Sequence, residues 1–277
     1  MINSETRLVA LFGSPVKNSL SPFIHNYLYE KYKVNSIYTC FDIENIKEGI
    51  DSLKVLNFKG INVTIPHKVE VINYLDEIDF NAKFVGAVNT IKNENGILKG
   101  FNTDGDGFVK SILDTNYNLE NKNVLVIGAG GSSRSICISL CNQKIKTLKI
   151  FNRTIEKALD IKNIIDENFE TEALVSSEKI KELDLENIDV IINTTSIGME
   201  SDECPISRGI IPSENLLVCD IVYKPHETEF IKWAKSNSLN VIYGIDMLIN
   251  QAFEGFYILN NIKPNKEDYN YIIKNII

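Results

Sequence analysis

The chain alternates between short runs of apolar residues and longer stretches in which apolar positions recur with helical spacing. Short apolar runs bounded by polar residues or glycine are typical of strands, and the amphipathic stretches that follow them are typical of helices. The pattern predicts strands at 7–12, 36–42, 60–64, 123–128, 147–151, 189–195, 216–222 and 240–243, and a hairpin with strands at 86–92 and 97–100 around Asn95-Gly96. It predicts four helices over 45–56, 104–115, 154–168 and 226–237. Two further helices begin at Pro22 and near Pro66, one follows the strand at 123–128 and ends near residue 142, and the tail 246–277 looks helical.

The regular succession of strand and helix predicts an α/β fold with parallel sheets and right-handed crossovers. We expect two domains, an N-terminal α/β domain over residues 1–103 and a second α/β domain over residues 104–244. The tail, residues 245–277, has no strand of its own to pack on. We therefore expect it to return to the first domain and complete it.

Composition and charge narrow the class of protein. A chain of 277 residues with 44% hydrophobic and 24% charged residues is typical of a globular protein, which excludes disordered, collagen-like and coiled-coil chains. No apolar run approaches the roughly 18 residues that span a bilayer, and the N-terminal segment does not resemble a signal peptide. The net charge of -8 argues against nucleic acid or an anionic membrane as partner.

Cysteine and histidine usage indicates the compartment and argues against a metal site. The five cysteines are an odd number without a CxxC pair, which predicts reduced thiols in the cytoplasm. The three histidines lack metal-ligand spacing, so we expect no metal.

A glycine-rich turn, Gly128-Ala129-Gly130-Gly131-Ser132-Ser133, follows one predicted strand and opens a helix. The first glycine permits a tight turn, and the second lets the backbone approach a pyrophosphate that the helix N-terminus attracts. Ser133 in the third slot is small enough for the helix to pack closely on the strand. In this context the turn predicts dinucleotide binding rather than a plain strand–helix connection.

The end of the next strand distinguishes between the two nicotinamide cofactors. An NAD site usually has Asp or Glu there, to bind the ribose hydroxyls. This chain has Asn152-Arg153-Thr154, with Lys157 one turn later. An arginine can bind the adenosine 2′-phosphate and stack on adenine. The segment therefore predicts NADP as cofactor, and a solvated helix start is the alternative.

Two polar groups of the first domain are candidates for ligand binding. Ser19 and Ser21 place two hydroxyls at a predicted helix start, where they bind an anion or where Ser21 simply caps the helix ahead of Pro22. Asn62 and Thr64 share one side of a strand, and Lys68 falls in the first turn of the helix predicted from Pro66. A cation there opposes the helix macrodipole by up to about 1 kcal/mol, which favours acid–base chemistry over a plain surface lysine.

Asn89 and Asp104 extend this polar set. Asn89 ends the segment GAVNT, and Asp104 lies in FNTDG, where it or Asn102 is also placed to cap the following helix. In open α/β sheets ligands bind at the carboxyl ends of strands. Two asparagines, a threonine and an aspartate at such ends predict a polyhydroxylated ligand.

These segments together resemble the NADP-dependent shikimate dehydrogenase family, whose members reduce 3-dehydroshikimate. The resemblance extends from residue 13 to 252, in family order. It is carried by GSPVKNSLSPFIHN, GINVTIPHK, GAVNT, FNTDG, GAGGSSRS, NRT, NTTSIGM, DIVYKPHET and GIDMLINQA.

The resemblance implies a function for each matching position. The implied catalytic pair is Lys68 and Asp104. The implied shikimate contacts are Ser19, Ser21, Asn62, Thr64, Lys68, Asn89, Asp104, Tyr223 and Gln251. The implied NADP contacts are Gly128, Ala129, Gly130, Gly131, Ser132, Asn152, Arg153, Thr154, Lys157, Thr194, Ser196, Gly244 and Met247.

Two positions depart from the family pattern. Asn18 stands where the family often has His, and Asp246 where it often has a small uncharged residue. Neither belongs to the implied catalytic pair, although Asp246 is placed to alter substrate range or domain closure.

The resemblance implies reversible reduction of 3-dehydroshikimate to shikimate by NADPH, in chorismate biosynthesis. It implies an N-terminal substrate domain and a Rossmann-type NADP domain with the site between them. The sequence leaves monomer and homodimer both open. One alternative is a quinate/shikimate dehydrogenase with relaxed substrate or NAD use. Another, from a different class, is a non-catalytic NADP-binding sensor, which would keep the glycine-rich turn but has no need of Lys68 with Asp104.

Overall fold

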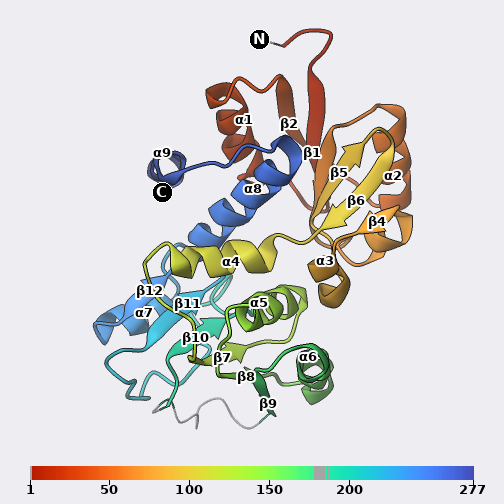
Figure 1. Ribbon diagram of the computed structural model, residues 1–277. Helices are drawn as coiled ribbons and strands as arrows, with labels where there is room; N and C mark the ends of the chain where they lie inside the picture. The colour runs from red at the N-terminus through yellow and green to blue at the C-terminus, as the bar shows by residue number, and fades with distance from the viewer. Residues whose placement is uncertain (1, 178–184, 186) are drawn as a thin grey trace. The chain divides into compact units, whose positions relative to one another are not determined.

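The computed structural model describes residues 2–177, 185 and 187–277, which form two compact units. The first unit comprises Met1–Thr103 and Gln251–Ile277, and the second comprises Asp104–Asn250. Each unit is built on its own six-stranded sheet (Figure 1). The predicted α/β class is therefore confirmed.

The sheet of the first unit is mixed, with strand order β2-β1-β3-β5-β6-β4. Strands β1, β2 and β3 are parallel, as predicted, and β5 runs antiparallel to both β3 and β6, so the predicted hairpin is confirmed and makes the sheet mixed. The cause is the tight turn at Asn95 and Gly96, whose φ angles of 56° and 94° reverse the chain at once. The elements are β1 Arg7–Gly13, α1 Ser21–Lys31, β2 Ser36–Asp42, α2 Ile46–Val55, β3 Gly60–Val63, the 3₁₀ helix η1 Glu70–Tyr74, β4 Glu77–Ile78, α3 Phe80–Val85, β5 Thr90–Glu94 and β6 Ile97–Phe101.

Alternate residues of β1 and β3 pack on opposite faces of this sheet. Ala10 and Phe12 of β1 join a core with Ile61 and with Ile50 of α2. The other face meets α1 and the end of α8 (Gly244–Asn260), where a Cβ on Gly60 would lie 2.5 Å from Leu259. The sheet is thus covered on both faces.

The predicted helix from Pro66 is not formed. Residues 65–69 make turns, and only η1 follows. The Lys68 carbonyl accepts a hydrogen bond from Val88 N at 2.8 Å instead of one from its own helix. Lys68 therefore does not sit in the first turn of an α-helix, and the macrodipole argument made from the sequence does not apply to it.

The start of α1 also differs from the prediction. The helix begins at Ser21, with Leu20 as N-cap, so Ser21 is not the capping residue. Instead the Ser19 Oγ accepts from Ser21 N at 3.2 Å.

The tail forms two helices, α8 and α9 (Lys266–Ile276). Asp268 holds α9 against α1, because its buried carboxylate pairs with Lys31 Nζ at 2.6 Å and accepts from Tyr32 Oη at 2.6 Å. The same carboxylate accepts from Asn265 N and closes a capping box. These bonds tie the last helix to the first unit.

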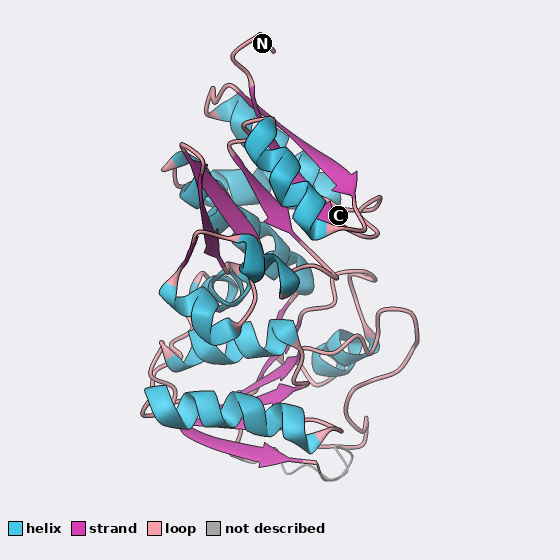
Figure 2. Ribbon diagram, turned by 90° about the vertical axis from the view of Figure 1, so that its right-hand side faces the viewer, coloured by secondary structure: helices cyan, strands magenta, loops and turns pink. Residues whose placement is uncertain are grey.

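The second unit has a fully parallel sheet of order β12-β11-β10-β7-β8-β9. Counted within the unit, this is the doubly wound order of dinucleotide-binding folds. Helices cover both faces, α4, α5 and α6 on one and α7 on the other (Figure 2). The elements are α4 Asp104–Leu113, β7 Asn123–Ile127, α5 Gly131–Cys141, β8 Thr147–Phe151, α6 Ile155–Asn168, β9 Glu172–Ser176, β10 Val190–Asn193, β11 Leu217–Asp220, α7 Glu229–Ser236 and β12 Asn240–Ile242.

Three short elements were not predicted: β4, β9 and α3. Each lacks a distinctive apolar run. In the described part of the chain no helix combines the length and the apolar character that crossing a membrane requires.

Candidate active site

The glycine-rich turn connects β7 to α5, as predicted. Gly128 has φ 110°, and a Cβ there would lie 2.6 Å from Thr194 Oγ1, so glycine is required on both counts. Ser133 is fully buried and its Oγ donates to Gly128 O at 2.7 Å, which closes the turn. Strand order reverses between β7 and β10, and Gly128 and Thr194 follow the carboxyl ends of these two strands. This is where open α/β sheets bind ligands.

The open space next to Gly130 and Gly131 of this turn suits a pyrophosphate. A Cβ on Gly130 or Gly131 would meet no heavy atom within 4 Å among the described residues. Gly130 is the N-cap of α5 and, within the described chain, no side chain caps the helix. Backbone N–H groups with open space before them are what a phosphate needs. Ala129 and Ser132 complete the turn.

The segment after β8 fits an adenosine 2′-phosphate. Asn152 N donates to Ser176 O, and its side chain donates to Thr154 O at 2.7 Å, which shapes the loop before α6. Arg153 and Lys157 are exposed, and neither forms an ion pair with a residue that the structure describes. Their charges are thus available to a phosphate.

A second polar group, missed in the sequence, lies at the ends of β10 and β11. The buried Asp220 accepts from Asn193 Nδ2 at 2.9 Å, from Thr228 Oγ1 at 2.6 Å and from Val222 N at 3.0 Å. Burial raises the pKa of this carboxyl to about 6, although the three hydrogen bonds act in the opposite direction. The signal was present in the sequence as an acid ending the apolar run LLVCD.

The remaining residues expected at the cofactor differ in exposure. Ser196 is exposed, as is Tyr223, which is expected at the substrate. Met247 belongs to the hydrophobic core of the second unit, and a Cβ on Gly244 would lie 2.5 Å from Ile221 O, so both have a packing role. Their contact with a cofactor stays a prediction.

The polar residues of the first unit form a continuous hydrogen-bonded network. Tyr38 Oη donates to Asn62 Oδ1 at 2.8 Å, and Asn62 Nδ2 donates to Thr90 Oγ1 at 2.9 Å and to Asn89 O at 3.2 Å. The Ser21 hydroxyl lies close enough to Tyr38 to lower the pKa of the tyrosine hydroxyl. The structure thus brings two residues expected to bind substrate, Asn62 and Asn89, into one network, with Ser21 beside it. Sequence reasoning missed Tyr38 and Thr90, because a strand tyrosine and threonine carry no functional signal.

The same network reaches the expected catalytic residues along the chain. Asn89 Oδ1 accepts from Thr103 N at 2.9 Å, and Asn89 Nδ2 donates to Thr103 Oγ1 at 3.0 Å. Asp104 follows directly as the first residue of α4, and Lys68 O accepts from Val88 N, next to Asn89. Thr64 N donates to Phe12 O at the end of β1.

Helix α8 carries Gln251 toward this network. A Cβ on Gly255 would lie 3.4 Å from Thr90 Oγ1 and 3.5 Å from Asn62 Nδ2. Gln251 is one turn earlier on the same face of the helix. Its side chain is therefore directed along the face that covers Asn62.

The first turn of α4 is fixed by its packing on α5. Gly105 N donates to Ser135 Oγ at 2.8 Å, and a Cβ on Gly105 would overlap the Ser135 carbonyl oxygen. Asp106 accepts from Ser139 Oγ at 2.7 Å. The helix that begins at the glycine-rich turn thus also holds the residue next to Asp104.

His25 is the most strongly perturbed histidine in the described chain. It is buried and stacks on Tyr38, with ring centroids 4.3 Å apart and planes 4° apart. Burial lowers the pKa of its imidazole from 6.5 to about 3. Its ring is therefore neutral at physiological pH and serves as an apolar platform.

We expect acidification to destabilise the protein through His25. Between pH 6.5 and 3 the unfolded chain binds a proton at His25 that the folded chain does not, so the stability present above pH 6.5 is lost as pH falls. The loss from pH 6.5 to 5 is about 2 kcal/mol, at about 1.4 kcal/mol per pH unit. Urea unfolding of wild type and His25→Phe across this range measures it.

The effect of Asp220 on the pH dependence of stability is opposite to that of His25. Because its folded pKa of about 6 exceeds the ordinary 3.8, its contribution is lost as pH rises between these values. Comparing wild type with His25→Phe cancels that common contribution. Equal slopes for the two proteins would contradict the assignment to His25.

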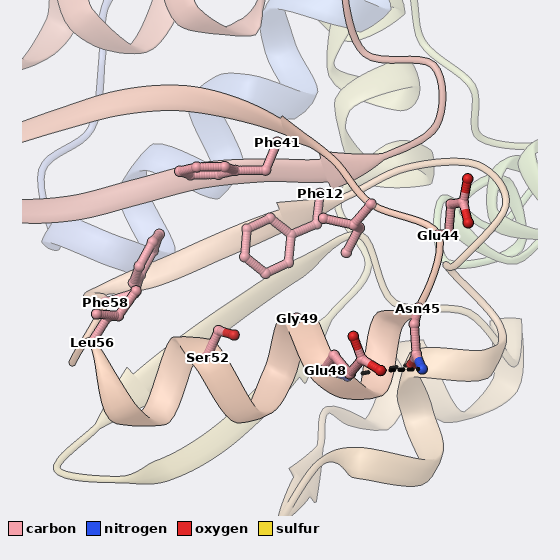
Figure 3. Close-up of a pocket in the computed structure, with 10 residues that line it drawn as sticks. Phe12, Phe41, Glu44, Asn45, Glu48, Gly49, Ser52, Leu56 and Phe58 are labelled. Carbon is pink, nitrogen blue, oxygen red and sulfur yellow. Dashed lines mark hydrogen bonds between the residues drawn. The ribbon is translucent and has the colours of Figure 1, made fainter.

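A separate pocket of about 560 Å³ lies between α2 and the β1–β2 edge of the first unit (Figure 3). The rings of Phe12, Phe41 and Phe58 stand on its strand side, and Glu48 and Ser52 on its helix side. None of the residues expected to bind shikimate or NADP lines it. In the described residues no group of three His, Cys, Asp or Glu side chains is placed to hold a metal ion.

The parallel sheet of the second unit and the glycine-rich turn after β7 together define a Rossmann-type dinucleotide-binding protein, which carries a second α/β unit. Two family models match the chain, "Shikimate dehydrogenase substrate binding domain" over residues 11–91 and "Shikimate / quinate 5-dehydrogenase" over residues 108–207. The chain belongs to the shikimate dehydrogenase family, which confirms the resemblance.

Relatives match over the full length. The shikimate dehydrogenase (NADP(+)) of Caldanaerobacter subterraneus subsp. tengcongensis is 42% identical, with 93% of this chain and 92% of the relative covered. That of Methanococcus aeolicus is 43% identical, with 100% and 99% covered. A solved structure of a shikimate dehydrogenase in complex with NADP+ is 37% identical, with a TM-score of 0.90 and coverage of 100% and 98%.

One of the two departures from the family pattern has a structural reason. The Asp246 carboxylate accepts from Tyr243 N at 3.0 Å, so it secures the start of α8. The structure shows no comparable reason for Asn18, which lies in an exposed turn.

Proposed function

We propose that this protein catalyses the reversible NADPH-dependent reduction of 3-dehydroshikimate to shikimate, in chorismate biosynthesis. The observation that carries the proposal is the hydrogen-bonded network of Tyr38, Asn62 and Asn89 in the first unit, which has Ser21 beside it. It occurs in a chain whose second unit has an open glycine-rich turn and an unpaired Arg153, among the described residues. Hydroxyl and amide groups suit a polyhydroxylated acid, and the turn with the arginine suits NADP.

The substrate is bound by the first unit with help from the helix that returns to it. Ser19 and Ser21 bind the carboxylate through their hydroxyls, without a salt bridge. The ring hydroxyls and the reacting carbon are held by Asn62, Thr64, Lys68, Asn89, Asp104, Tyr223 and Gln251. Support comes from the hydrogen bonds of Asn62 and Asn89 and from the position of Gln251 on α8.

The cofactor is bound by the second unit. Gly128, Ala129, Gly130, Gly131 and Ser132 hold the pyrophosphate. The adenosine end is held by Asn152, Arg153, Thr154 and Lys157, and the nicotinamide end by Thr194, Ser196, Gly244 and Met247. The cofactor supplies, when bound, the hydride that reduces the carbonyl carbon.

Lys68 and Asp104 carry the proton chemistry. In reduction, the Lys68 ammonium, or a water that it holds, donates a proton to the oxygen that becomes the hydroxyl. In oxidation the same group removes that proton. Asp104 orients Lys68 and accepts a hydrogen bond from a substrate hydroxyl. Each catalytic cycle thus adds one hydride and one proton to the carbonyl, or removes them.

The test is NADPH formation when purified protein meets shikimate and NADP, followed by absorbance. Parallel assays with quinate and with NAD distinguish the relaxed-specificity alternative. An absence of reduced cofactor, NADPH or NADH, with all four pairs of substrate and cofactor, in protein that still binds NADP, would favour a sensor.

The protein acts on small molecules, and we further propose that it works in the cytoplasm as a monomer or homodimer. The odd cysteine count and the thiols of Cys137, Cys141 and Cys219, all buried and unpaired, support a reducing compartment. Light scattering of the purified protein decides between the two assembly states.

A further inference from the structure

Tyr38 reaches Asn62 across a whole strand. The sheet order is β2-β1-β3, with Tyr38 on β2, Asn62 on β3 and β1 between them. In register, Tyr38 pairs with Val9 and Asn62 with Leu11, and residues two apart on β1 share a face. The two side chains therefore lie on the same face, on strands roughly 10 Å apart. A tyrosine is long enough to bridge that distance, and its Oη–Oδ1 distance is 2.8 Å.

The Asn62 amide is held in one orientation. Nδ2 faces the Asn89 carbonyl oxygen at 3.2 Å, and a carbonyl can only accept. The Asn62 oxygen must therefore point the other way, toward the Tyr38 hydroxyl that donates to it. If the amide were flipped, Asn62 Oδ1 would face the Asn89 carbonyl oxygen, and two acceptors would repel each other.

This orientation decides what Asn62 offers to a ligand. Within the described chain, Nδ2 donates to Thr90 Oγ1 and to Asn89 O, which uses both of its hydrogens. Oδ1 takes one hydrogen bond from Tyr38 and keeps a second lone pair. Asn62 is thus prepared to accept a hydrogen bond from a ligand hydroxyl, rather than to donate one.

Tyr38 is itself rigidly placed. Its side chain is 2% exposed, its ring stacks on His25, and its hydroxyl donates to Asn62 Oδ1. Burial raises the pKa of its hydroxyl well above 10, although Ser21 lowers it, so the group stays a donor at any working pH. Nothing else on this face is placed to donate to Asn62 Oδ1 among the described residues.

We propose that Tyr38 is a positioning residue for substrate binding: its hydroxyl fixes the Asn62 amide so that Oδ1 accepts a hydrogen bond from a hydroxyl of the substrate. Tyr38 acts through Asn62 and does not touch the substrate. This inference rests on the proposed function.

The test is Tyr38→Phe, which keeps the ring and the stack on His25. We expect the KM for shikimate to rise about 3- to 15-fold, the usual worth of one hydrogen bond, with a smaller change in kcat and none in the KM for NADP. The matched control is Tyr29→Phe. Tyr29 is also 2% exposed and contacts Phe256 in the same aromatic cluster, but its hydroxyl makes no hydrogen bond to the network in the described chain.

Thr90→Val gives an independent test if Tyr38→Phe does not fold. It removes the other side-chain partner of the Asn62 amide, and we expect the same selective rise in the KM for shikimate. In folded Tyr38→Phe, an unchanged KM for shikimate would overturn the role of Tyr38. An equal rise in the KM for NADP would overturn it as well. The wild-type rate with shikimate tests the proposed function by itself, so the two failures are distinguishable.

Discussion

Replacing Lys68 by Ala is expected to lower kcat for shikimate oxidation by about 10²–10⁴, the usual contribution of a positioned acid or base. Binding of shikimate should weaken much less, because the lysine proton acts mainly in the transition state. Lys68 is partly buried in the turn between β3 and η1, next to the segment that carries Asn89. Steady-state NADPH formation measures the change.

The Lys68 prediction has a partner and a control. Asp104→Asn should also lose turnover, and the double variant should cost little more than the worse single change if the two residues act as one unit. Lys83→Ala, at an exposed lysine of α3, is the matched control and should leave kcat unchanged. Near-normal turnover in Lys68→Ala would exclude this lysine as the proton carrier and leave Asp104 or a bound water.

Replacing Arg153 by Ala is expected to lower kcat/KM for NADP by about 10- to 100-fold and to leave kcat/KM for NAD nearly unchanged. The reason is that NAD lacks the 2′-phosphate, and a hydrogen bond to a charged group is worth about 1.5–3 kcal/mol. Arg153 is exposed and without an ion-pair partner in the described chain, so its removal leaves no buried acid behind. Initial rates with each cofactor at saturating shikimate measure the ratio.

The control for Arg153 lies on α6, the helix that follows it. Lys162→Ala removes a cation that pairs with Asp166 at 2.5 Å and should leave both cofactor constants unchanged. A second cation, Lys157, begins the same helix one turn after Arg153, and Lys157→Ala should show a smaller loss with the same selectivity for NADP. Equal losses with NADP and NAD in Arg153→Ala would contradict the 2′-phosphate assignment.

Much of the fold could be predicted because it depends on local pattern. The strands of the second unit lie within two residues of their predicted ends, apart from β9. Continuous apolar runs between amphipathic helices leave few other arrangements than a parallel sheet. The glycine-rich turn was predictable for the same reason, since φ at Gly128 and packing at Ser133 are set within six residues.

The site was predictable as a set of residues but not as a geometry. Ser21, Asn62 and Asn89 were identified from polarity at strand and helix ends, and from the family resemblance. Tyr38, the hydrogen-bond donor to Asn62, lies 24 positions before it in the chain. Its role could not be predicted, because a tyrosine in a strand is ordinary and carries no functional signal. Sequence pattern indicates which groups are polar, whereas the partner of each group depends on how remote strands align.

The sequence by itself determined the α/β class, the dinucleotide turn, the arginine that favours NADP and the family. Tertiary structure alone decided that the hairpin strand β5 pairs with β3, that Lys68 lies in a turn, and that Asn62 presents its oxygen. The physical reason is the range of the interactions. Propensity, capping and glycine geometry act over a few residues, but a bond such as Val88 N to Lys68 O joins segments distant in the chain and overrides the local helix signal.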